Sequence, residues 1–396
     1  MGLIGRAARL ICAAVLGALL AASGARAATP LDGDSMWIWV VGRSSGGDPD
    51  AIVRRAHRYG IESIVIKGAD GRAPWTQFDP AFVARLKAGG LRVCAYQFVY
   101  GRYPRAEAAV GAALRDAGAD CLMIDAEGAY EGRYFQAQTY LRSLRARVGP
   151  DYPVGLAGFP YVHYHPGYPY SVFLGPGGAQ FNMPQMYWRA IGTSVDHVYD
   201  VTYRYNAVYG RPVLPLGQVY AHPPTRQIRR FRQLAMLHGA AGTSWWDWQV
   251  AGGREWRAVS AVLPPLLGVG APVQAPPVQR YPLLARGARG DLVVWAQLHL
   301  ASAGETVPID GIFGRRTKRA VLDFQLLHSL PQAGVVGPRT WQALRLLPPA
   351  PVTWRRRGGA RVVTASRAPR GRIALAAPHS ARLPARLDEL GGRRGR

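Results

Sequence analysis

Two carboxylates stand two residues apart at the end of an apolar run, Cys121-Leu-Met-Ile-Asp125-Ala-Glu127-Gly128. In a β-strand, residues i and i+2 point to the same side and lie about 7 Å apart, so Asp125 and Glu127 can reach into one cleft. Paired acids can divide general-acid and charge-stabilising work between them. Without such a purpose, two acids at the end of an apolar strand would repel each other and be costly to bury. We therefore expect this strand end to carry the chemistry.

The surrounding sequence repeats a strand and then a helix eight times within residues 33–267. Eight such units in roughly 235 residues match an α/β fold of the (β/α)8 type, the TIM barrel. The predicted strands are 36–41, 63–68, 92–99, 121–127, 154–159, 179–187, 213–220 and 242–248. Pro184 predicts an irregular edge in the sixth strand. The carboxyl ends of barrel strands form the active-site face, and the two acids lie at one of them.

Polar and aromatic residues gather at the other predicted strand ends. Aromatic faces stack on sugar rings, while carboxylates and amides hydrogen-bond their hydroxyl groups, so we expect a carbohydrate cleft. Its candidate substrate-binding residues are Trp39, Lys67, Asp70, Tyr96, Gln97, Gln185, Gln218, Tyr220 and Trp246, and its candidate catalytic residues are Glu127, Asp125, Tyr187 and Asp247. Two alternatives stay open: the tryptophans could fill the barrel interior, and Lys67 could be a structural ion-pair partner.

His163 and His165 have a spacing seen in metal ligands, but no HExxH motif and no third ligand accompanies them. Histidines beside tyrosines in a loop are more often hydrogen-bonding surface groups. We therefore expect neither a metal nor another cofactor.

The N-terminus predicts export. Arginines precede an apolar run of about 13 residues and a small-residue cleavage site, so residues 1–27 read as a signal peptide, with an uncleaved anchor as the alternative. No later run is long enough for a transmembrane segment. We expect a secreted protein of the cell wall or periplasm. Cys94 and Cys121 lie on neighbouring predicted strands and could pair in an oxidising compartment, but buried strand thiols are more often plain core residues, so free thiols are favoured.

The formal net charge is +25, and much of it lies near the C-terminus. Residues 348–396 form an Arg-rich segment that we expect to be disordered and available to anionic wall polymers or lipid surfaces. Its arginines lack interleaved aromatic residues apart from Trp354, so nucleic acid is not an expected partner. Residues 268–280, rich in Pro and Ala, read as a semi-rigid linker.

Residues 281–347 predict a small all-α domain with three helices, around 290–300, 315–328 and 338–346, and a core of Phe313, Phe324 and Trp341. The runs Asp310-Gly-Ile-Phe313-Gly314 and Gly334-Val-Val-Gly-Pro-Arg-Thr-Trp341 occur within it. This segment resembles the bacterial peptidoglycan-binding domain of the three-helix type over nearly its whole length. The resemblance implies peptidoglycan as a partner; a helical module that binds something else is the alternative.

The barrel resembles two glycosidase families. Asp120-Cys-Leu-Met123-Ile-Asp125-Ala-Glu127 is similar to the fourth-strand signature D-x-x-D-x-D-x-E of family 18 glycoside hydrolases, the chitinase-like barrels, with Met123 at the second Asp. Gln185-Met-Tyr187 resembles their M-x-Y-D region, with Trp188 in place of the Asp. The D-x-E, residues 64–71 and residues 95–98 also resemble family 25 lysozymes, although Trp37-Ile-Trp39 occupies the place of their first-strand Asp.

Both resemblances imply hydrolysis of an N-acetylated glycan by a muramidase-like or N-acetylglucosaminidase-like enzyme. Glu127 would protonate the glycosidic oxygen, Asp125 would assist attack by the substrate's acetamido group, and Tyr187 would steady that group. Asp247 could instead act as base or nucleophile. Two other classes stay open, a non-catalytic wall-binding protein with a degenerate barrel and a peptidoglycan amidase or peptidase. The latter would be indicated by a zinc site or a Cys-His pair, and the sequence shows neither.

Overall fold

The computed structural model describes residues 29–263, 277–356 and 360–362. The predicted signal peptide, most of the predicted linker and the chain beyond residue 362 lie outside this part of the chain. None of the helices within these ranges is long and apolar enough to cross a membrane.

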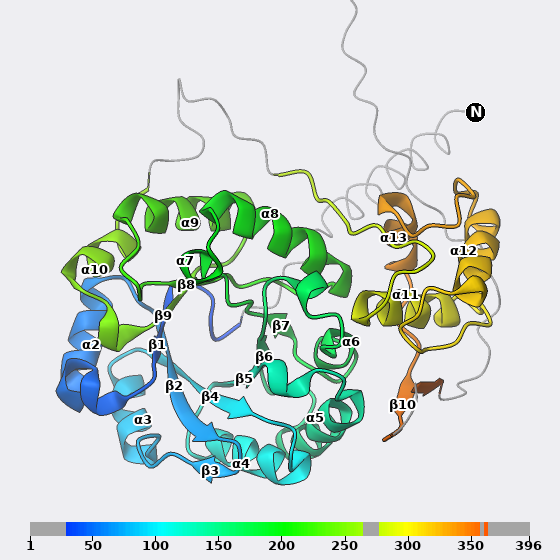
Figure 1. Ribbon diagram of the computed structural model, residues 1–396. Coiled ribbons are helices and arrows are strands. Elements are labelled where there is room, and N and C mark those ends of the chain that lie inside the picture. Colours follow the sequence, from blue (N-terminus) through cyan, green and yellow to red (C-terminus); the bar gives the residue numbers. More distant parts are fainter. Residues whose placement is uncertain (1–28, 264–276, 357–359, 363–396) are drawn as a thin grey trace, which may run out of the picture.

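Eight parallel strands curl into the wall of a barrel (Figure 1). They are β1 (Ser35–Ile38), β2 (Ser63–Asp70), β4 (Arg92–Val99), β5 (Cys121–Ala126), β6 (Val154–Ala157), β7 (Phe181–Asn182), β8 (Leu216–Gln218) and β9 (Ser244–Trp246). Their order is β7-β6-β5-β4-β2-β1-β9-β8, and a short β3 (Ala73–Pro74) adds to β2. This arrangement confirms the predicted fold.

The sixth strand is the irregular one, as Pro184 predicts. β7 ends at Asn182, and the chain then meets β8 only through isolated parallel bridges, Asn182 with Val213 and Gln185 with Leu216. These bridges close the barrel between its first and last neighbours in the sheet. They also bring Gln185 to the carboxyl end of the barrel.

Helices surround the strands (Figure 1). They are α2 (Pro49–Arg58), α3 (Pro80–Ala88), α4 (Pro104–Asp116), α5 (Tyr134–Val148), α6 (Tyr170–Phe173), α7 (Trp188–Ile191), α8 (Val195–Asn206), α9 (Thr225–Leu237) and α10 (Gly253–Val259). The first two illustrate the local cause: Asp48 and Asp79 cap the first free backbone N–H groups, and a proline follows each as the first helical residue.

Strand alternation separates two apolar layers. Side chains of one parity pack between the sheet and the helices, whereas those of the other, such as Trp37, Tyr96 and Met123, fill the barrel interior. Cys94 and Cys121 belong to the interior set and form a disulfide, which corrects the expectation of free thiols. The register of β4 and β5 places them directly opposite each other, with Cα atoms 4.6 Å apart.

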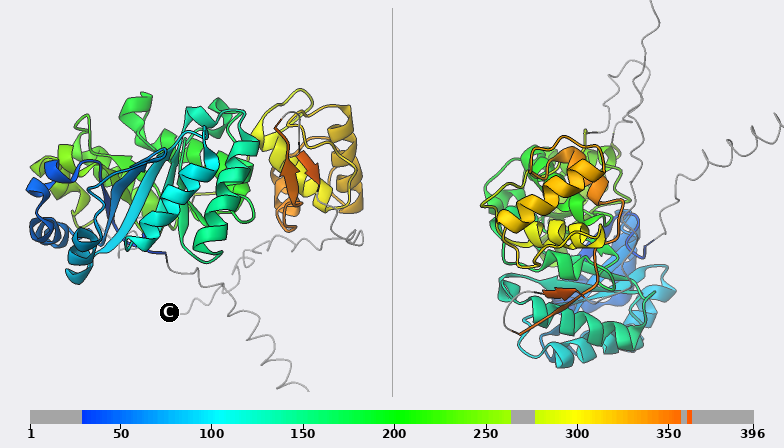
Figure 2. Two further views of the ribbon diagram at one scale, coloured as in Figure 1. Left: turned by 90° about the horizontal axis from the view of Figure 1, so that it is seen from below. Right: turned by 90° about the vertical axis from the view of Figure 1, so that its right-hand side faces the viewer.

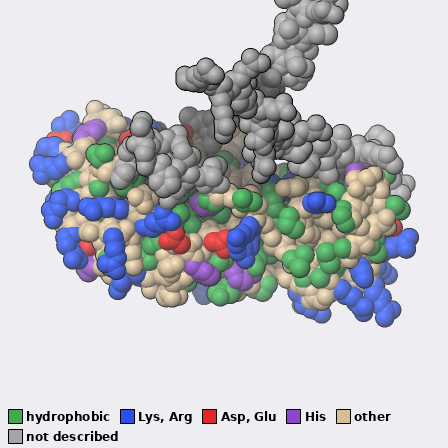
Figure 3. All heavy atoms as spheres, turned by 90° about the horizontal axis from the view of Figure 1, so that it is seen from above, with side chains coloured by type: hydrophobic (Ala, Val, Ile, Leu, Met, Phe, Trp, Pro, Cys, Tyr) green, Lys and Arg blue, Asp and Glu red, His purple; other side chains and the backbone are tan. Residues whose placement is uncertain are grey.

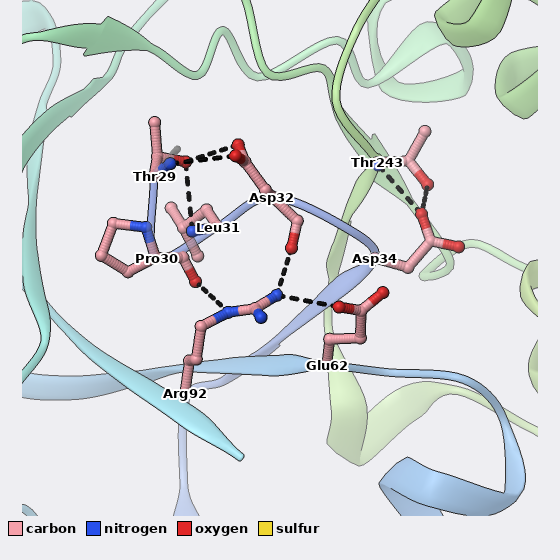
Figure 4. Close-up of polar contacts among 8 residues, drawn as sticks. All are labelled: Thr29, Pro30, Leu31, Asp32, Asp34, Glu62, Arg92 and Thr243. Atoms are coloured by element: carbon pink, nitrogen blue, oxygen red, sulfur yellow. Dashed lines mark hydrogen bonds and ion pairs between the residues drawn. The ribbon is translucent and has the colours of Figure 1, made fainter. Parts of the chain in front are cut away.

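The first described residues cross the floor of the barrel (Figure 4). Leu31 inserts into the interior cluster. Arg92 donates hydrogen bonds to the carbonyl oxygens of Pro30 and Asp32 and pairs with Glu62, and Asp34 accepts from the backbone and hydroxyl of Thr243. The amino ends of the strands are thus covered, which leaves the carboxyl ends as the open face of the barrel.

A three-helix domain lies beside the barrel (Figures 1 and 2). Its helices are α11 (Asp291–Ser302), α12 (Arg315–Leu327) and α13 (Pro338–Leu344), and its buried core includes Phe313, Phe324 and Trp341 as predicted. Lys and Arg side chains are spread over both this domain and the barrel (Figure 3).

The predicted disordered tail begins too early. Residues Val352–Trp354 form β10, which pairs with β11 (Ala360–Val362). Trp354 is buried because its ring lies on Tyr134 of α5, with ring centroids 4.2 Å apart. The apolar residues among the arginines therefore anchor this part of the segment.

Candidate active site

Asp125 and Glu127 share one hydrogen-bond donor at the end of β5. The Nε2 of Gln185 donates to Asp125 Oδ1 at 3.1 Å and to Glu127 Oε1 at 3.0 Å. Asp125 is only 8% exposed, whereas Glu127 is half-buried. The predicted pair therefore converges on a common point, and the amide that joins it comes from the irregular sixth strand, just after β7.

Burial raises the pKa of Asp125 well above that of a free aspartate, and the negative charge of Glu127 adds to this effect. Lys67 acts in the opposite direction but does not bond to either acid; its ion pair is with Asp70. Asp125 consequently takes up a proton more readily than an exposed aspartate. In that form it can donate a hydrogen bond to a neighbouring oxygen.

Tyr187 and Tyr96 border the acid pair. Burial, and then the charge of Asp125, raises the pKa of Tyr187, so its phenol stays neutral and can donate a hydrogen bond. Its ring meets that of Tyr220 edge to face at 5.4 Å. Tyr96 lies deeper, against Trp37 and Trp246, and within the described residues its hydroxyl has no hydrogen-bond partner. Neutral hydroxyl groups thus face the space beside the carboxylates.

Asp247 follows β9 and is 2% exposed. Burial raises its pKa to about 7, and its Oδ2 has no partner among the described residues. Its charge acts on Tyr96, as does that of Asp125. Asp247 therefore borders the same tyrosine as Asp125 and is a second buried carboxyl whose pKa burial raises.

Lys67 belongs to a structural ion pair. Its Nζ lies 2.6 Å from Asp70 Oδ2 and 4.7 Å from the ring centre of Trp75. The other oxygen of Asp70 accepts from the hydroxyl of Tyr100 at 2.7 Å. This cluster supports the rim next to Asp125 and supplies the positive charge that reaches it.

Two of the predicted substrate-binding residues, Gln97 and Gln218, make hydrogen bonds outside the site. Gln97 points away from the interior, because it neighbours the inward-facing Tyr96; its amide binds the carbonyls of Gly71 and Glu107 and the hydroxyl of Tyr140. Gln218 accepts from the backbone N–H groups of Arg189 and Ala190 at the start of α7 and donates to the carbonyl of Tyr220. Both amides hold backbone rather than line the cleft.

The tryptophans divide by position. Trp37 fills the interior, and Trp245 and Trp248 pack in the outer apolar layer. Trp246 is half-buried against Trp37, whereas Trp39, just beyond β1, is 44% exposed. Of these five tryptophans, Trp246 and Trp39 can present a face to a ligand.

His163 and His165 lie in the loop after β6 and face aromatic rings. His163 stacks on Tyr205, and His165 stacks on Phe159 and pairs with Glu131. Within the described residues, no group of three or more His, Cys, Asp or Glu side chains is arranged to hold a metal ion.

One supporting residue has no signature in the sequence. The buried Tyr168, from the same loop, donates from its hydroxyl to the carbonyl of Ala126 at 2.9 Å. Ala126 is the residue between the two acids. A tyrosine in an aromatic-rich loop carries no spacing signal, so sequence reasoning could not single it out.

Comparison with known proteins identifies the C-terminal domain. Residues 289–344 match the family model of the putative peptidoglycan binding domain. A peptidoglycan-binding protein from Clostridioides difficile, solved in complex with glutamine hydroxamate, is 36% identical over 17% of this chain, with a TM-score of 0.16. The match spans 42% of that protein, which is less than half of it. No curated protein sequence matches the chain.

Solved structures similar to the barrel have low sequence identity. A chitinase from Chromobacterium violaceum is 11% identical, with a TM-score of 0.41. The match covers 58% of this chain and 98% of the chitinase chain. The spore cortex-lytic enzyme SleL of Bacillus cereus is 10% identical over 57% of this chain and 73% of its own, with a TM-score of 0.42. The family match confirms the predicted C-terminal module: the chain carries a (β/α)8 barrel followed in sequence by a putative peptidoglycan-binding domain at residues 289–344.

Proposed function

We propose that the barrel hydrolyses an N-acetylated cell-wall glycan, as a muramidase-like or N-acetylglucosaminidase-like enzyme. The observation that carries this proposal is the amide of Gln185 holding Asp125 and Glu127 together at the open end of β5. The peptidoglycan-binding domain supports the choice of polymer. A linked binding module raises the concentration of enzyme at an insoluble substrate.

Glu127 is the more accessible acid of the pair and serves as the general acid that protonates the leaving glycosidic oxygen. Asp125, whose pKa is raised by burial, orients and stabilises the substrate's acetamido group as its oxygen attacks the anomeric carbon. This route needs no nucleophile from the protein. The neutral phenol of Tyr187 donates to the same acetamido group. Water then opens the cyclic intermediate and releases a new reducing end.

The Cys94–Cys121 disulfide supports export, because such bonds persist in oxidising compartments. We therefore place the protein outside the cytoplasm, at the cell wall or in the periplasm.

A second candidate is wall binding without catalysis, and Met123 favours it. This side chain occupies the interior below Asp125, beside the Cys94–Cys121 disulfide and Phe181, where the family 18 signature has a further acid. Met123 itself therefore offers Asp125 an apolar side chain where a carboxylate would stand. In this case the barrel would present a glycan-binding surface only.

The test is release of reducing ends from purified peptidoglycan by the wild type, Glu127→Gln and Asp116→Asn. Asp116 is an exposed acid at the end of α4 that pairs with Arg115, so its variant controls for loss of a charge. We expect Glu127→Gln to reduce the rate at least about 100-fold and the control to keep it. Equal release by all three proteins, or none by the wild type, would reject the catalytic proposal.

A further inference from the structure

The peptidoglycan-binding domain is joined to the barrel by a buried carboxylate. Asp291, the first residue of α11, is 1% exposed. Its Oδ2 accepts from the backbone N–H of Ser171 and the hydroxyl of Tyr209, both at 2.8 Å, and its Oδ1 accepts from the Ser171 hydroxyl at 2.6 Å. Its own N–H donates to the carbonyl of Pro166 at 2.8 Å. Donors from two elements of the barrel thus converge on one buried carboxyl of the peptidoglycan-binding domain.

Two more contacts fix the orientation of the domain. Trp295, one turn further along α11, donates from Nε1 to the carbonyl of Val208 at 2.8 Å. On the far side, Gln138 of α5 donates to the carbonyl of Val352 and accepts from the N–H of Trp354 in β10. The domain is therefore held at several points rather than by the linker alone, and Figures 1 and 2 show α11 beside α6.

The loop that receives Asp291 also supports the acid pair. Within residues 165–171, Tyr168 donates to the carbonyl of Ala126, and Gly167 accepts from the N–H of Gly132 at 2.8 Å. Ala126 lies between Asp125 and Glu127, and Gly132 lies in the turn that follows them. Residues 165–171 are thus hydrogen-bonded both to α11 of one domain and to the strand end of the other.

We propose that Asp291 is a positioning residue: the peptidoglycan-binding domain, through Asp291, holds the loop 165–171, and this loop holds the backbone that carries Asp125 and Glu127. The consequence for catalysis rests on the proposed glycosidase function, whereas the structural coupling does not. Small displacements matter because a misplacement of about 1 Å can reduce a rate by about 100-fold. The domain consequently completes the active site as well as binding the wall.

The first test measures the coupling without catalysis. Hydrogen exchange is followed by mass spectrometry at residues 128–135 and 165–171 in the full-length wild type, Asp291→Ala and Asp323→Asn. Asp323 lies in the same domain, partly exposed on α12 and paired with Arg319, and serves as the matched control. We expect faster exchange in both segments for Asp291→Ala only. Exchange unchanged at 128–135 would overturn the proposal, whether or not the barrel hydrolyses any glycan.

The second test measures the effect on chemistry with a soluble N-acetylated oligosaccharide too short to reach the binding domain. Loss of wall anchoring then has no effect on the rate. We expect Asp291→Ala to lower kcat about 10- to 100-fold with KM nearly unchanged, and Tyr168→Phe to lower it in the same direction. An active enzyme whose kcat is unaffected by both changes would refute positioning. If Asp291→Ala fails to fold, Ser171→Ala, which removes only one hydroxyl, takes its place in both tests.

Discussion

Asp125 and Asp291 are both buried aspartates whose pKa is raised by burial, yet their surroundings differ in kind. Asp291 receives three hydrogen bonds from Ser171 and Tyr209 and faces no other carboxylate among the contacts that shift its pKa. Among the described residues, Asp125 accepts from one side-chain donor, Gln185, which it shares with Glu127, and the charge of Glu127 disfavours its ionisation. Burial alone does not identify a reactive acid. A buried acid with few hydrogen-bond donors of its own can still accept a hydrogen bond from a ligand.

The largest expected effect is on activity at Asp125. Replacing it by Asn keeps the shape and removes the carboxyl that assists the acetamido group, so we expect a loss of about 10² to 10³ in kcat. The free energy of unfolding should stay the same or rise, because a buried acid beside Glu127 is removed. Hydrolysis rates and urea unfolding check both parts. Lost stability with retained activity would give Asp125 the structural role we assign to Asp291.

In contrast to Asp125→Asn, Asp291→Ala should lower the free energy of unfolding. It leaves the Ser171 and Tyr209 donors buried without their acceptor, so we expect a loss of about 3 kcal/mol in the free energy of unfolding at pH 7. Urea unfolding monitored by tryptophan fluorescence measures this, with Asp323→Asn as the control. A loss no larger than that of the control would show that the interdomain contact is not a stabilising one.

The pH dependence of stability provides a further test. Burial raises the pKa of Asp291 to about 6, above the 3.8 of a free aspartate, so the folded state binds this proton more tightly than the unfolded state. The stabilisation is therefore fully present below pH 4 and is lost as the pH rises through 6, by about 3 kcal/mol at most. Between pH 4 and 7, the free energy of unfolding should fall less steeply for Asp291→Asn than for the wild type. If the two curves of free energy against pH are parallel, groups other than Asp291 cause the fall.

The smallest expected effect compares two buried amides. Gln185→Met removes the donor shared by the two acids, and we expect about a tenfold loss of activity. Gln97→Met removes the amide that joins Gly71, Glu107 and Tyr140 outside the barrel interior, so it should lower stability and leave kcat unchanged. Reversed effects in parallel assays would show that the site extends to the outer face of β4.

Much of this architecture follows from the sequence. Apolar strand-length runs predict all eight strands, and the D-x-E spacing predicts that Asp125 and Glu127 converge, because both features depend on local alternation. Alternation also explains Gln97: Tyr96 and Gln97 are neighbours and cannot both face the interior. Applying that rule to the third strand would have excluded Gln97 from the site.

Contacts between distant segments could not be predicted. The Cys94–Cys121 disulfide depends on the register of β4 and β5, and the attachment of Asp291 to the loop after β6 depends on how two domains pack. Likewise, Trp354 stands among arginines in the sequence, and its burial on Tyr134 depends on contacts with the distant α5. Residue patterns report local geometry and leave such pairings open.

The most direct test of the central claim is hydrolysis of purified peptidoglycan in water enriched in ¹⁸O, with the products analysed by mass spectrometry. The proposed reaction predicts one ¹⁸O at the new reducing end of a sugar for the wild type and loss of this product for Glu127→Gln. Label in the lactyl carboxylate of muramic acid would indicate an amidase, and label in a peptide carboxylate would indicate a peptidase. No label in any product would indicate a barrel that only binds the wall. Each of these results would contradict the proposed reaction.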